Sequence, residues 1–219
     1  NRTAPLPVVA LLGHINHGKT TLLDALCGSS FVQEEPGGIT QGVRTVTSQV
    51  AYDVARRPSG AQEESAGGAL GKQPKPSNTL SAREAPDARM TLLDTPGHEA
   101  FELTRGRTMA AADLAVVVVS VERGAEVQTE EVLLHANRWG VPIIFALNKI
   151  DLPSAHVNLT RAELRRQCQR LHEQGLVDTD WTREAEEAVP ISALQGLGLG
   201  DLVRRVRQVL AGLPVLPSR

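Results

Sequence analysis

Close to its N-terminus the chain reads Gly13-His14-Ile15-Asn16-His17-Gly18-Lys19-Thr20, which fits the phosphate-loop pattern GxxxxGK(S/T). The apolar residues 7–12 lead into this stretch as a strand would, and residues 21–26 leave it with helical character. A phosphate loop stands between a strand and a helix, and the segments on either side of this pattern match that context. A glycine turn with a chance Lys-Thr pair is the simpler alternative, and the rest of the chain decides between the two.

The residue types in this loop suit a bound phosphate. Gly13 and Gly18 allow backbone conformations that a β-carbon forbids, so successive N–H groups can point at phosphate oxygens where the helix begins. Lys19 would reach the β- and γ-phosphates, and the Thr20 hydroxyl would bind Mg²⁺.

The composition is that of an ordinary globular chain. Its 219 residues are enough for one α/β domain with a real core, and 41% of them are apolar. The net charge of −2 gives no general attraction to nucleic acid or to an anionic membrane. With two Trp, one Tyr and three Phe, the chain has too few aromatic residues for a base-stacking surface. We expect a monomer that makes no membrane contact.

The cysteines and the chain ends carry less information. Cys27 and Cys168 have no metal-ligand spacing, so we expect buried or half-buried free thiols in a reducing compartment. The chain begins with Asn1 and shows no leader, so we expect a piece of a longer protein in which residues 214–219 begin a linker.

Strand and helix patterns alternate along the chain, which is typical of an α/β, doubly wound, mainly parallel six-stranded sheet with helices on both faces. Strands are expected at 7–12, 43–54, 89–94, 114–121, 141–147 and 187–191, and helices at 21–26, 100–112, 128–139, 159–174 and 199–210. The alternating, β-branched segment 43–54 suits an edge or antiparallel strand. Residues 56–88 hold four Pro, four Gly and few large apolar residues, which predicts a disordered insertion.

Four polar motifs each follow a predicted strand directly: the loop at 13–20, Asp94, Asn-Lys-Ile-Asp at 148–151 and Ser-Ala at 192–193. Because ligands of an open parallel sheet bind outside the carboxyl ends of its strands, these motifs should converge on one rim. Asp94 can hold Mg²⁺ through water, and Gly97 has no side chain to block its N–H from a γ-phosphate.

The segment 148–151 has side chains that suit the recognition of a nucleotide base. Asp151 can accept hydrogen bonds from N1–H and the 2-amino group of guanine, a pair of donors that adenine lacks. Asn148 would tie neighbouring loops together, the Lys149 stem would lie over the base, and the Ala193 N–H would donate to guanine O6. A polar strand exit is the alternative for this segment alone, but the order of the motifs predicts a guanine-nucleotide site.

With these motifs in order, the chain resembles the translational GTPases, and among them the GTPase domain of bacterial-type translation initiation factor two. The segments that carry the resemblance are Gly13-His14 with His17-Gly18-Lys19-Thr20, Gly37-Gly38-Ile39-Thr40-Gln41, Asp94-Thr95-Pro96-Gly97-His98-Glu99-Ala100-Phe101, Asn148-Lys149-Ile150-Asp151, and Gly175-Leu176-Val177 before Trp181. The resemblance covers nearly the whole chain except residues 56–88. It implies a P-loop GTPase domain over residues 1–213.

The resemblance also implies catalytic roles. Thr40 is similar to the switch threonine that meets Mg²⁺ and the γ-phosphate only in the GTP state, and residues 95–112 resemble the second switch. His98 is similar to the histidine that orients the attacking water on the ribosome, and Lys19 completes the implied catalytic set. Without an arginine finger, intrinsic hydrolysis should be slow, on the order of 10⁻⁴ to 10⁻² per second, and should be accelerated by the ribosome.

Motifs and resemblance together define the expected ligands and partners. The expected GTP-binding residues are Gly13, His14, Asn16, His17, Gly18, Lys19, Thr20, Thr21, Asp94, Gly97, Asn148, Lys149, Asp151, Ser192, Ala193 and Leu194. The expected Mg²⁺ ligands are Thr20, Thr40 and Asp94. The implied partners are GTP or GDP, the ribosome, and initiator tRNA held by domains outside this chain.

Three features depart from the family's pattern. Asn16 replaces the usual acid, and some potassium-activated GTPases carry asparagine at the matching position, so we expect a monovalent cation, K⁺ or Na⁺, beside the phosphates. Leu194 replaces the usual lysine after Ser-Ala, which should weaken base stacking slightly. The insertion at 56–88 and the Ala/Arg-rich composition favour an organellar version in the mitochondrial matrix over one in the bacterial cytoplasm.

Other candidate residues are assigned simpler roles. We expect His14 and His17 to shape the loop rather than to catalyse. His135, His156 and His172 are expected on the surface, and a solvated helix face is favoured over an RNA contact for Arg161, Arg165, Arg166 and Arg170.

The main hypothesis is a GTP-hydrolysing switch that helps to place initiator tRNA and to join ribosomal subunits. The alternative is a nucleotide-gated scaffold or ribosome-assembly GTPase that binds GTP with little turnover and uses residues 56–88 as a partner-binding arm. Thr40 and His98 favour the enzyme, whereas the insertion and Asn16 leave room for the scaffold. An elongation-type factor is disfavoured by the segment 37–41.

Overall fold

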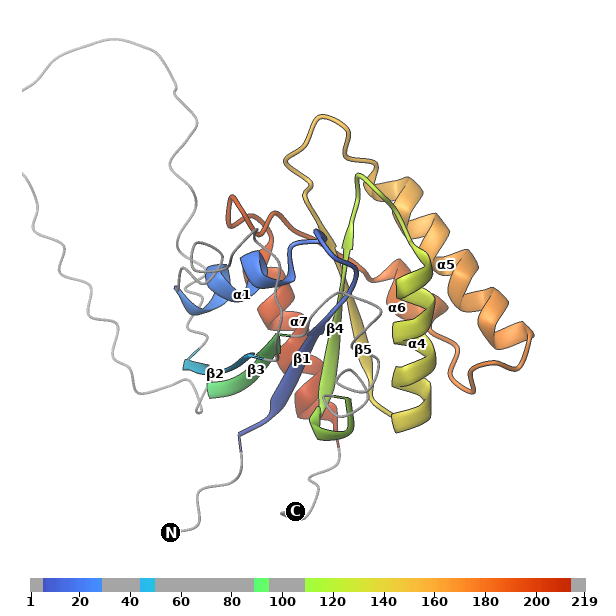
Figure 1. The fold of residues 1–219 in the computed structure, drawn as a ribbon, viewed down its shortest axis with the longest axis horizontal. Coiled ribbons are helices and arrows are strands. Elements are labelled where there is room, and N and C mark those ends of the chain that lie inside the picture. The colour runs from blue at the N-terminus through green and yellow to red at the C-terminus, as the bar shows by residue number, and fades with distance from the viewer. Residues whose placement is uncertain (1–5, 29–43, 50–88, 95–108, 214–219) are drawn as a thin grey trace, which may run out of the picture.

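The computed structural model describes residues 6–28, 44–49, 89–94 and 109–213 (Figure 1). Its strands are β1 (Val8–Leu12), β2 (Arg44–Gln49), β3 (Arg89–Asp94), β4 (Leu114–Ser120), β5 (Ile143–Asn148) and β6 (Val189–Pro190). Its helices are α1 (Lys19–Cys27), α4 (Val127–Trp139), α5 (Val157–Glu173), α6 (Thr182–Glu186) and α7 (Leu199–Gly212). The predicted insertion at 56–88 and the predicted linker at 214–219 lie outside the described residues.

The strands form one six-stranded sheet in the order β2-β3-β1-β4-β5-β6. β2 runs antiparallel to β3, and the other neighbouring pairs are parallel, which confirms the predicted doubly wound α/β sheet. Leu11 of β1 pairs with Asp94 at the end of β3, and Ser120 at the end of β4 pairs with Asn148 at the end of β5. The carboxyl ends of four parallel strands therefore meet at one edge.

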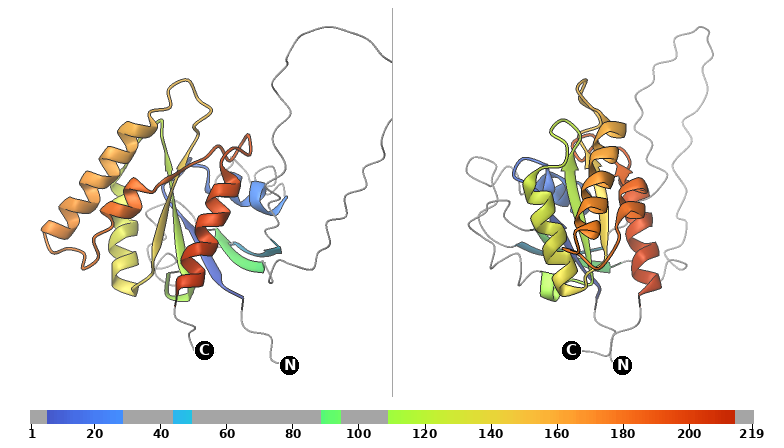
Figure 2. Two further views of the ribbon diagram at one scale, coloured as in Figure 1. Left: turned by 180° about the vertical axis from the view of Figure 1, so that it is seen from behind. Right: turned by 90° about the vertical axis from the view of Figure 1, so that its right-hand side faces the viewer.

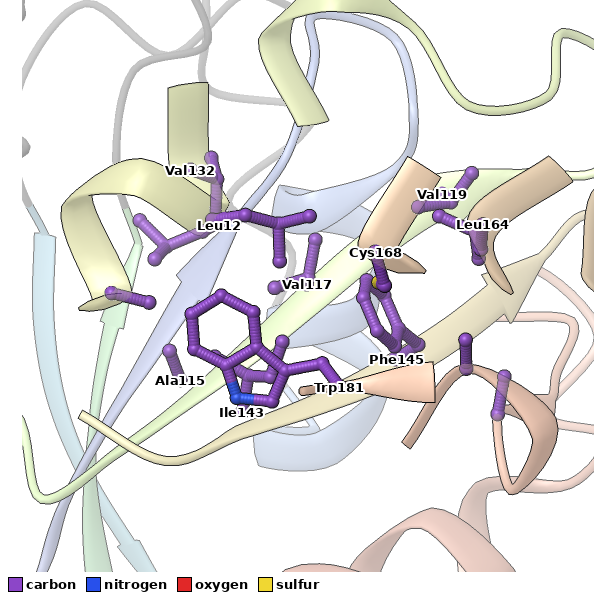
Figure 3. Close-up of a cluster of buried hydrophobic side chains, with 14 of the residues drawn as sticks. Leu12, Ala115, Val117, Val119, Val132, Ile143, Phe145, Leu164, Cys168 and Trp181 are labelled. Carbon is purple, nitrogen blue, oxygen red and sulfur yellow. The ribbon is translucent and has the colours of Figure 1, made fainter. Parts of the chain in front are cut away.

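Two apolar cores lie on opposite faces of this sheet, because alternate residues of a strand point to opposite sides. On β4, Val117 belongs to the core beneath α4, α5 and α6, whereas its neighbour Val116 belongs to the core beneath α1 and α7. The two groups of helices lie on either side of the sheet in Figure 2. Figure 3 shows Phe145 of β5 beside Cys168 of α5 in the first of these cores. The central strands read as unbroken apolar runs because both of their faces are covered.

The last strand and the helix before it differ from the expectation. A strand was expected at 187–191, but β6 contains only Val189–Pro190, and the unpredicted helix α6 ends just before it. A five-residue helix is too short to show a hydrophobic period, so no sequence pattern indicated it. The Ile191 N–H still donates to the Leu147 carbonyl at 2.8 Å, which extends the pairing with β5 by one bond.

Trp139 is a second difference. It stands at helical spacing with the buried apolar residues of α4, yet it is 48% exposed. Gly140 leaves the helix with φ of 62°, and the Val141 N–H bonds back to the Ala136 carbonyl at 3.0 Å. This Schellman ending turns the chain so that Val141 is buried while Trp139 lies at the surface.

The remaining expectations concern thiols, histidines and arginines. Cys168 is buried and Cys27 is half-buried, and both are free thiols as predicted. His156 and His172 are exposed, whereas His135 is half-buried. Arg165, Arg166 and Arg170 of α5 are exposed, but Arg161 is half-buried and donates to the Ala188 carbonyl at 3.1 Å. No helix among the described residues is long and apolar enough to cross a membrane.

Candidate nucleotide site

The loop after β1 packs tightly against the sheet edge. Gly13 has φ of 141°, and a β-carbon there would collide with the Val118 carbonyl oxygen of β4. Gly18 has φ of 89°, and a β-carbon there would collide with the Asn148 side-chain amide. Both positions therefore need glycine for two reasons, the backbone angle and the space. This agrees with the conformational freedom that the sequence pattern required of them.

Two buried polar residues begin the helix that follows the loop. Lys19 is 6% exposed, and its Nζ donates to the His14 carbonyl at 2.9 Å. Thr20 is 9% exposed, and its Oγ1 donates to Asp94 Oδ2 at 2.8 Å. Asp94 itself is fully buried at the end of β3. A buried hydroxyl beside a buried carboxylate is the all-oxygen donor set that Mg²⁺ prefers.

Asn148 joins three segments of the rim. Its Nδ2 donates to the His17 carbonyl at 2.8 Å. Its Oδ1 accepts from the Lys149 N–H at 2.8 Å and from the Ala193 N–H at 2.9 Å. These contacts match the tie between neighbouring loops that the sequence predicted for this residue. Figure 1 shows the loops after β1, β5 and β6 gathered at the upper end of the sheet.

The residues after Asn148 lie at the open side of the rim. Lys149 adopts φ of 71°, and its Nζ lies 3.5 Å from Glu122 Oε2 in the loop after β4. Asp151 is half-buried two residues further on. The ion pair with Glu122 was not foreseen, because nothing in the local pattern links two loops that are far apart in sequence.

The segment after β6 is also part of this rim. Ser192 is fully buried, and its Oγ accepts from the Gln195 N–H at 3.1 Å. The Ala193 N–H was expected to donate to guanine O6, but here it donates to Asn148. Leu194 is 79% exposed. A base in this place would have to compete with Asn148 for the Ala193 N–H.

Two loop histidines meet an acid that the sequence did not single out. Glu126 directly precedes α4, yet its side chain makes no capping hydrogen bond to that helix. Its Oε2 lies 3.0 Å from His14 Nδ1, and its Oε1 lies 3.9 Å from His17 Nε2. Burial lowers the pKa of His17 to about 3, so its ring is neutral at physiological pH. These contacts support the loop-shaping role expected for both histidines.

Several predicted site residues cannot be placed. Thr40, Gly97 and His98 lie outside the described residues, as does the greater part of the predicted second switch. Thr21 is half-buried in α1, and Asn16 is exposed with φ of 63° in the loop. The structure thus brings together the phosphate-loop, Asp94, Asn-Lys-Ile-Asp and Ser-Ala motifs, and it leaves the two switch residues as predictions.

A family comparison agrees with this arrangement. Residues 4–211 match the family described as the elongation factor Tu GTP binding domain. The chain belongs to this family. As an elongation factor Tu-type GTP-binding domain, it shares a class with GTPases that hydrolyse GTP and use Mg²⁺.

This GTP-binding domain is similar to parts of several longer proteins. It is 38% identical over 200 residues to translation initiation factor IF-2 of Microcystis aeruginosa and 36% identical over 215 residues to the chloroplastic IF-2 of Phaseolus vulgaris. It is 36% identical over 200 residues to IF-2 of Thermus thermophilus. These matches cover 91%, 97% and 91% of the chain but only 16%, 17% and 28% of the three factors. The chain therefore spans a small part of the relatives that it matches.

Solved structures share the fold of this domain. Elongation factor SelB of Methanococcus maripaludis, in complex with the GTP analogue GppNHp, matches with a TM-score of 0.65 at 20% identity over 99% of this chain and 36% of that one. Era of Aquifex aeolicus, bound to GDP·AlF4⁻, matches with a TM-score of 0.54 at 21% identity over 95% of this chain and 57% of that one. At these identities the likeness concerns the fold alone.

Proposed function

We propose that this chain is the GTP-binding and GTP-hydrolysing domain of a translation initiation factor of the IF-2 type. The observation that carries the proposal is the side chain of Asn148, which joins the loop after β1 to the segments after β5 and β6. If one segment binds the phosphates and the other two bind guanine, the three segments must be held in fixed positions relative to one another. The identity of 36% to 38% with IF-2 from bacteria and a chloroplast supports the assignment to initiation.

The nucleotide would lie along the rim. The backbone N–H groups of residues 13–20 would meet the phosphates, and Lys19 Nζ would exchange the His14 carbonyl for phosphate oxygens. Asp151 would accept from N1–H and the 2-amino group of guanine, and the stem of Lys149 would cover the base. The Ala193 N–H would turn from Asn148 Oδ1 to guanine O6. The exposed Leu194 would cover the base less well than the usual lysine.

The site fits Mg²⁺ as its resident metal. Thr20 Oγ1 and Asp94 Oδ2 already lie 2.8 Å apart in a buried position, and both are hard oxygen donors. Thr20 would bind the ion directly and Asp94 through water, with Thr40 added in the GTP state. Bound Mg²⁺ neutralises phosphate charge. What the chain itself supplies is the placement of these oxygens.

Hydrolysis would depend on positioning. Lys19 would stabilise the negative charge that develops on the phosphates, Thr40 would order the first switch, and His98 would orient the attacking water. Ribosome contact would bring His98 into place, so turnover by the isolated chain would be slow.

Asn16 would add a monovalent cation to the site. It stands exposed in the phosphate loop with φ of 63°, and its side-chain amide oxygen would serve as the ligand. The GTPase rate should then be higher in K⁺ than in Li⁺. Equal rates in the two salts would reject the monovalent-cation site at Asn16.

Partners and compartment extend the same proposal. The ribosome would bind the factor, and parts of the factor beyond this chain would hold initiator tRNA. The factor would act as a monomer. We place the factor in the mitochondrial matrix, with the bacterial cytoplasm as the alternative, because the insertion at 56–88 departs from the compact family pattern. Co-fractionation of the tagged full-length protein with matrix markers would support this compartment, and exclusion from them would reject it.

The deciding experiment is GTP hydrolysis by the full-length protein with and without matched ribosomes, comparing the natural protein with His98→Ala. We expect strong stimulation by ribosomes that is lost in the variant. Tight GTP binding without stimulation in either protein would contradict the switch. That outcome would favour a scaffold that uses the nucleotide only to set its shape.

A further inference from the structure

A second cluster of potential ligands lies beside the phosphate loop. His14 and His17 belong to the loop itself, and Glu126 is the residue directly before α4. One ring nitrogen of each histidine and one Glu126 oxygen all lie within 4.8 Å of one another. These atoms are separate from the pair of oxygens on Thr20 and Asp94 that suits Mg²⁺.

His17 has the arrangement of a metal-binding imidazole. Its Nδ1 lies 3.2 Å from the Val118 carbonyl oxygen. A carbonyl only accepts, so Nδ1 carries the proton and the Nε2 lone pair is left bare. Nε2 belongs to a fully buried side chain and has no hydrogen-bond partner among the described residues. A backbone carbonyl that orients a ring in this way is the usual support of a histidine ligand.

The distances suit a small ion with imidazole ligands. Zn²⁺ binds nitrogen and oxygen at about 2.0–2.1 Å, so two ligands of a tetrahedral site are separated by roughly 3.3 Å. His14 Nδ1 lies 3.0 Å from Glu126 Oε2, and His17 Nε2 lies 3.9 Å from the other oxygen, Oε1, so the two distances lie on either side of this value. The carboxylate would turn to present one oxygen to an ion held by both nitrogens. The ring centroids of His14 and His17 are 5.1 Å apart.

We propose that His14, His17 and Glu126 form a binding site for a divalent transition-metal ion, with Zn²⁺ as the ion that fits best. Two imidazole nitrogens and one carboxylate oxygen are a donor set for Zn²⁺ and its neighbours, whereas Mg²⁺ prefers oxygen alone. Water would fill the fourth position. The site goes beyond nucleotide binding, because it needs neither phosphate nor base.

Binding has local competitors and a structural consequence. His14 Nδ1 lies 2.7 Å from the Ile15 carbonyl, so it carries the ring proton, which would have to move to Nε2 before Nδ1 could bind the ion. Arg123 Nη1 lies 3.8 Å from Glu126 Oε1, and this contact must also yield. The ion can enter from solvent, because the side chains of His14 and Glu126 are 17% and 24% exposed. Once bound, it would fix the phosphate loop to the start of α4.

The test is a Zn²⁺ titration of the 219-residue chain, read with a chromophoric chelator, in the absence of nucleotide and Mg²⁺. We expect one equivalent of Zn²⁺, bound at least about tenfold more weakly by Glu126→Gln. Glu122→Gln is the matched control, because this acid stands in the same loop but pairs with Lys149. It should bind Zn²⁺ as the natural chain does. No binding by the natural chain, or equal affinity in Glu126→Gln, would overturn the site.

A second measurement needs no variant. X-ray absorption of the Zn²⁺-loaded natural chain should show nitrogen and oxygen ligands only, with two imidazoles. A sulfur ligand would place the ion at Cys27 or Cys168 and would reject the proposal.

Discussion

Asn148 Nδ2 donates a hydrogen bond of 2.8 Å to the His17 carbonyl, across 131 positions of sequence. The same side chain accepts from the N–H groups of Lys149 and Ala193. The bonds to the His17 carbonyl and the Lys149 N–H would remain when Ala193 turns to the base, so at about 1 kcal/mol for each of these two, Asn148→Ala should lower the affinity for guanine nucleotides roughly thirtyfold. The release of a fluorescent GDP derivative measures this change.

Asn137→Ala is the matched control for that variant. Asn137 also bridges two segments, because its amide donates to Asp178 at 3.3 Å and accepts from the Asp178 N–H at 2.8 Å. It lies at the end of α4, away from the rim. Equal loss of nucleotide affinity in both variants would mean that Asn148 acts through general stability and not through the site.

Thr20→Ala tests the proposed Mg²⁺ position. In the natural chain, chelation of Mg²⁺ should speed GDP release at least about tenfold, because the ion links the nucleotide to the protein. Without the Thr20 hydroxyl the release should be fast already and should change little on chelation. Thr182→Ala, which removes a hydroxyl that meets Asp180 beside α6, should behave as the natural chain does. A chelator effect that persists in Thr20→Ala would contradict the assignment.

His17 makes stability depend on pH. Its folded-state pKa is lowered by burial to about 3, whereas an unfolded histidine titrates near 6.5. Below pH 6.5 the unfolded chain therefore gains a proton that the folded chain does not. The stability contributed by neutral His17 is fully present above pH 6.5 and decreases as the pH is lowered below that value. Between pH 7 and 5 the free energy of unfolding should drop by about 2 kcal/mol from this residue.

Urea denaturation at pH 7, 6 and 5 with a chelator present measures this dependence. His17→Asn should lose most of the drop, whereas His156→Asn, at an exposed position, should keep it. An unchanged slope in His17→Asn would show that another group causes the pH dependence.

Cys168 should be chemically inert in the folded chain. Burial raises the pKa of its thiol to about 12, with Asp180 and Glu184 adding to the effect, so little reactive thiolate forms at pH 8. Iodoacetamide should label the half-buried Cys27 first and Cys168 only after unfolding in urea. Peptide mass spectrometry measures both sites, and equal labelling of the two in the native chain would contradict the buried position.

The sequence predicted the parts of this fold that have a local signature. The loop at 13–20 has fixed residues, the central strands are unbroken apolar runs, and segment 43–54 alternates, so order and layers could be inferred from the chain alone. The antiparallel edge strand β2 confirms that inference. α6 lacked any period, and the exposure of Trp139 could not be inferred from its helical spacing, because a Schellman ending depends on backbone hydrogen bonds that spacing does not report.

The residues of the candidate site likewise include some that the sequence predicted and some that it did not. The motif residues were identified because each follows a strand, and the parallel sheet brings strand ends together. Glu126 was missed, because an acid before a helix is typical of a capping charge, and only the folded chain turns it toward His14 and His17. The bond between Ala193 and Asn148 was also beyond sequence reasoning, since it joins residues 45 positions apart.

The most direct test of the guanine-nucleotide site is to compare the binding of GDP, ADP and xanthosine diphosphate to the natural chain and to Asp151→Asn. A carboxylate at 151 matches the two donors of guanine, whereas an amide there matches the carbonyl that xanthine carries in place of the amino group. The natural chain should bind GDP at least ~10³-fold more tightly than the other two, and Asp151→Asn should prefer xanthosine diphosphate. Equal binding of GDP and ADP by the natural chain, or an unchanged preference in Asp151→Asn, would contradict the account.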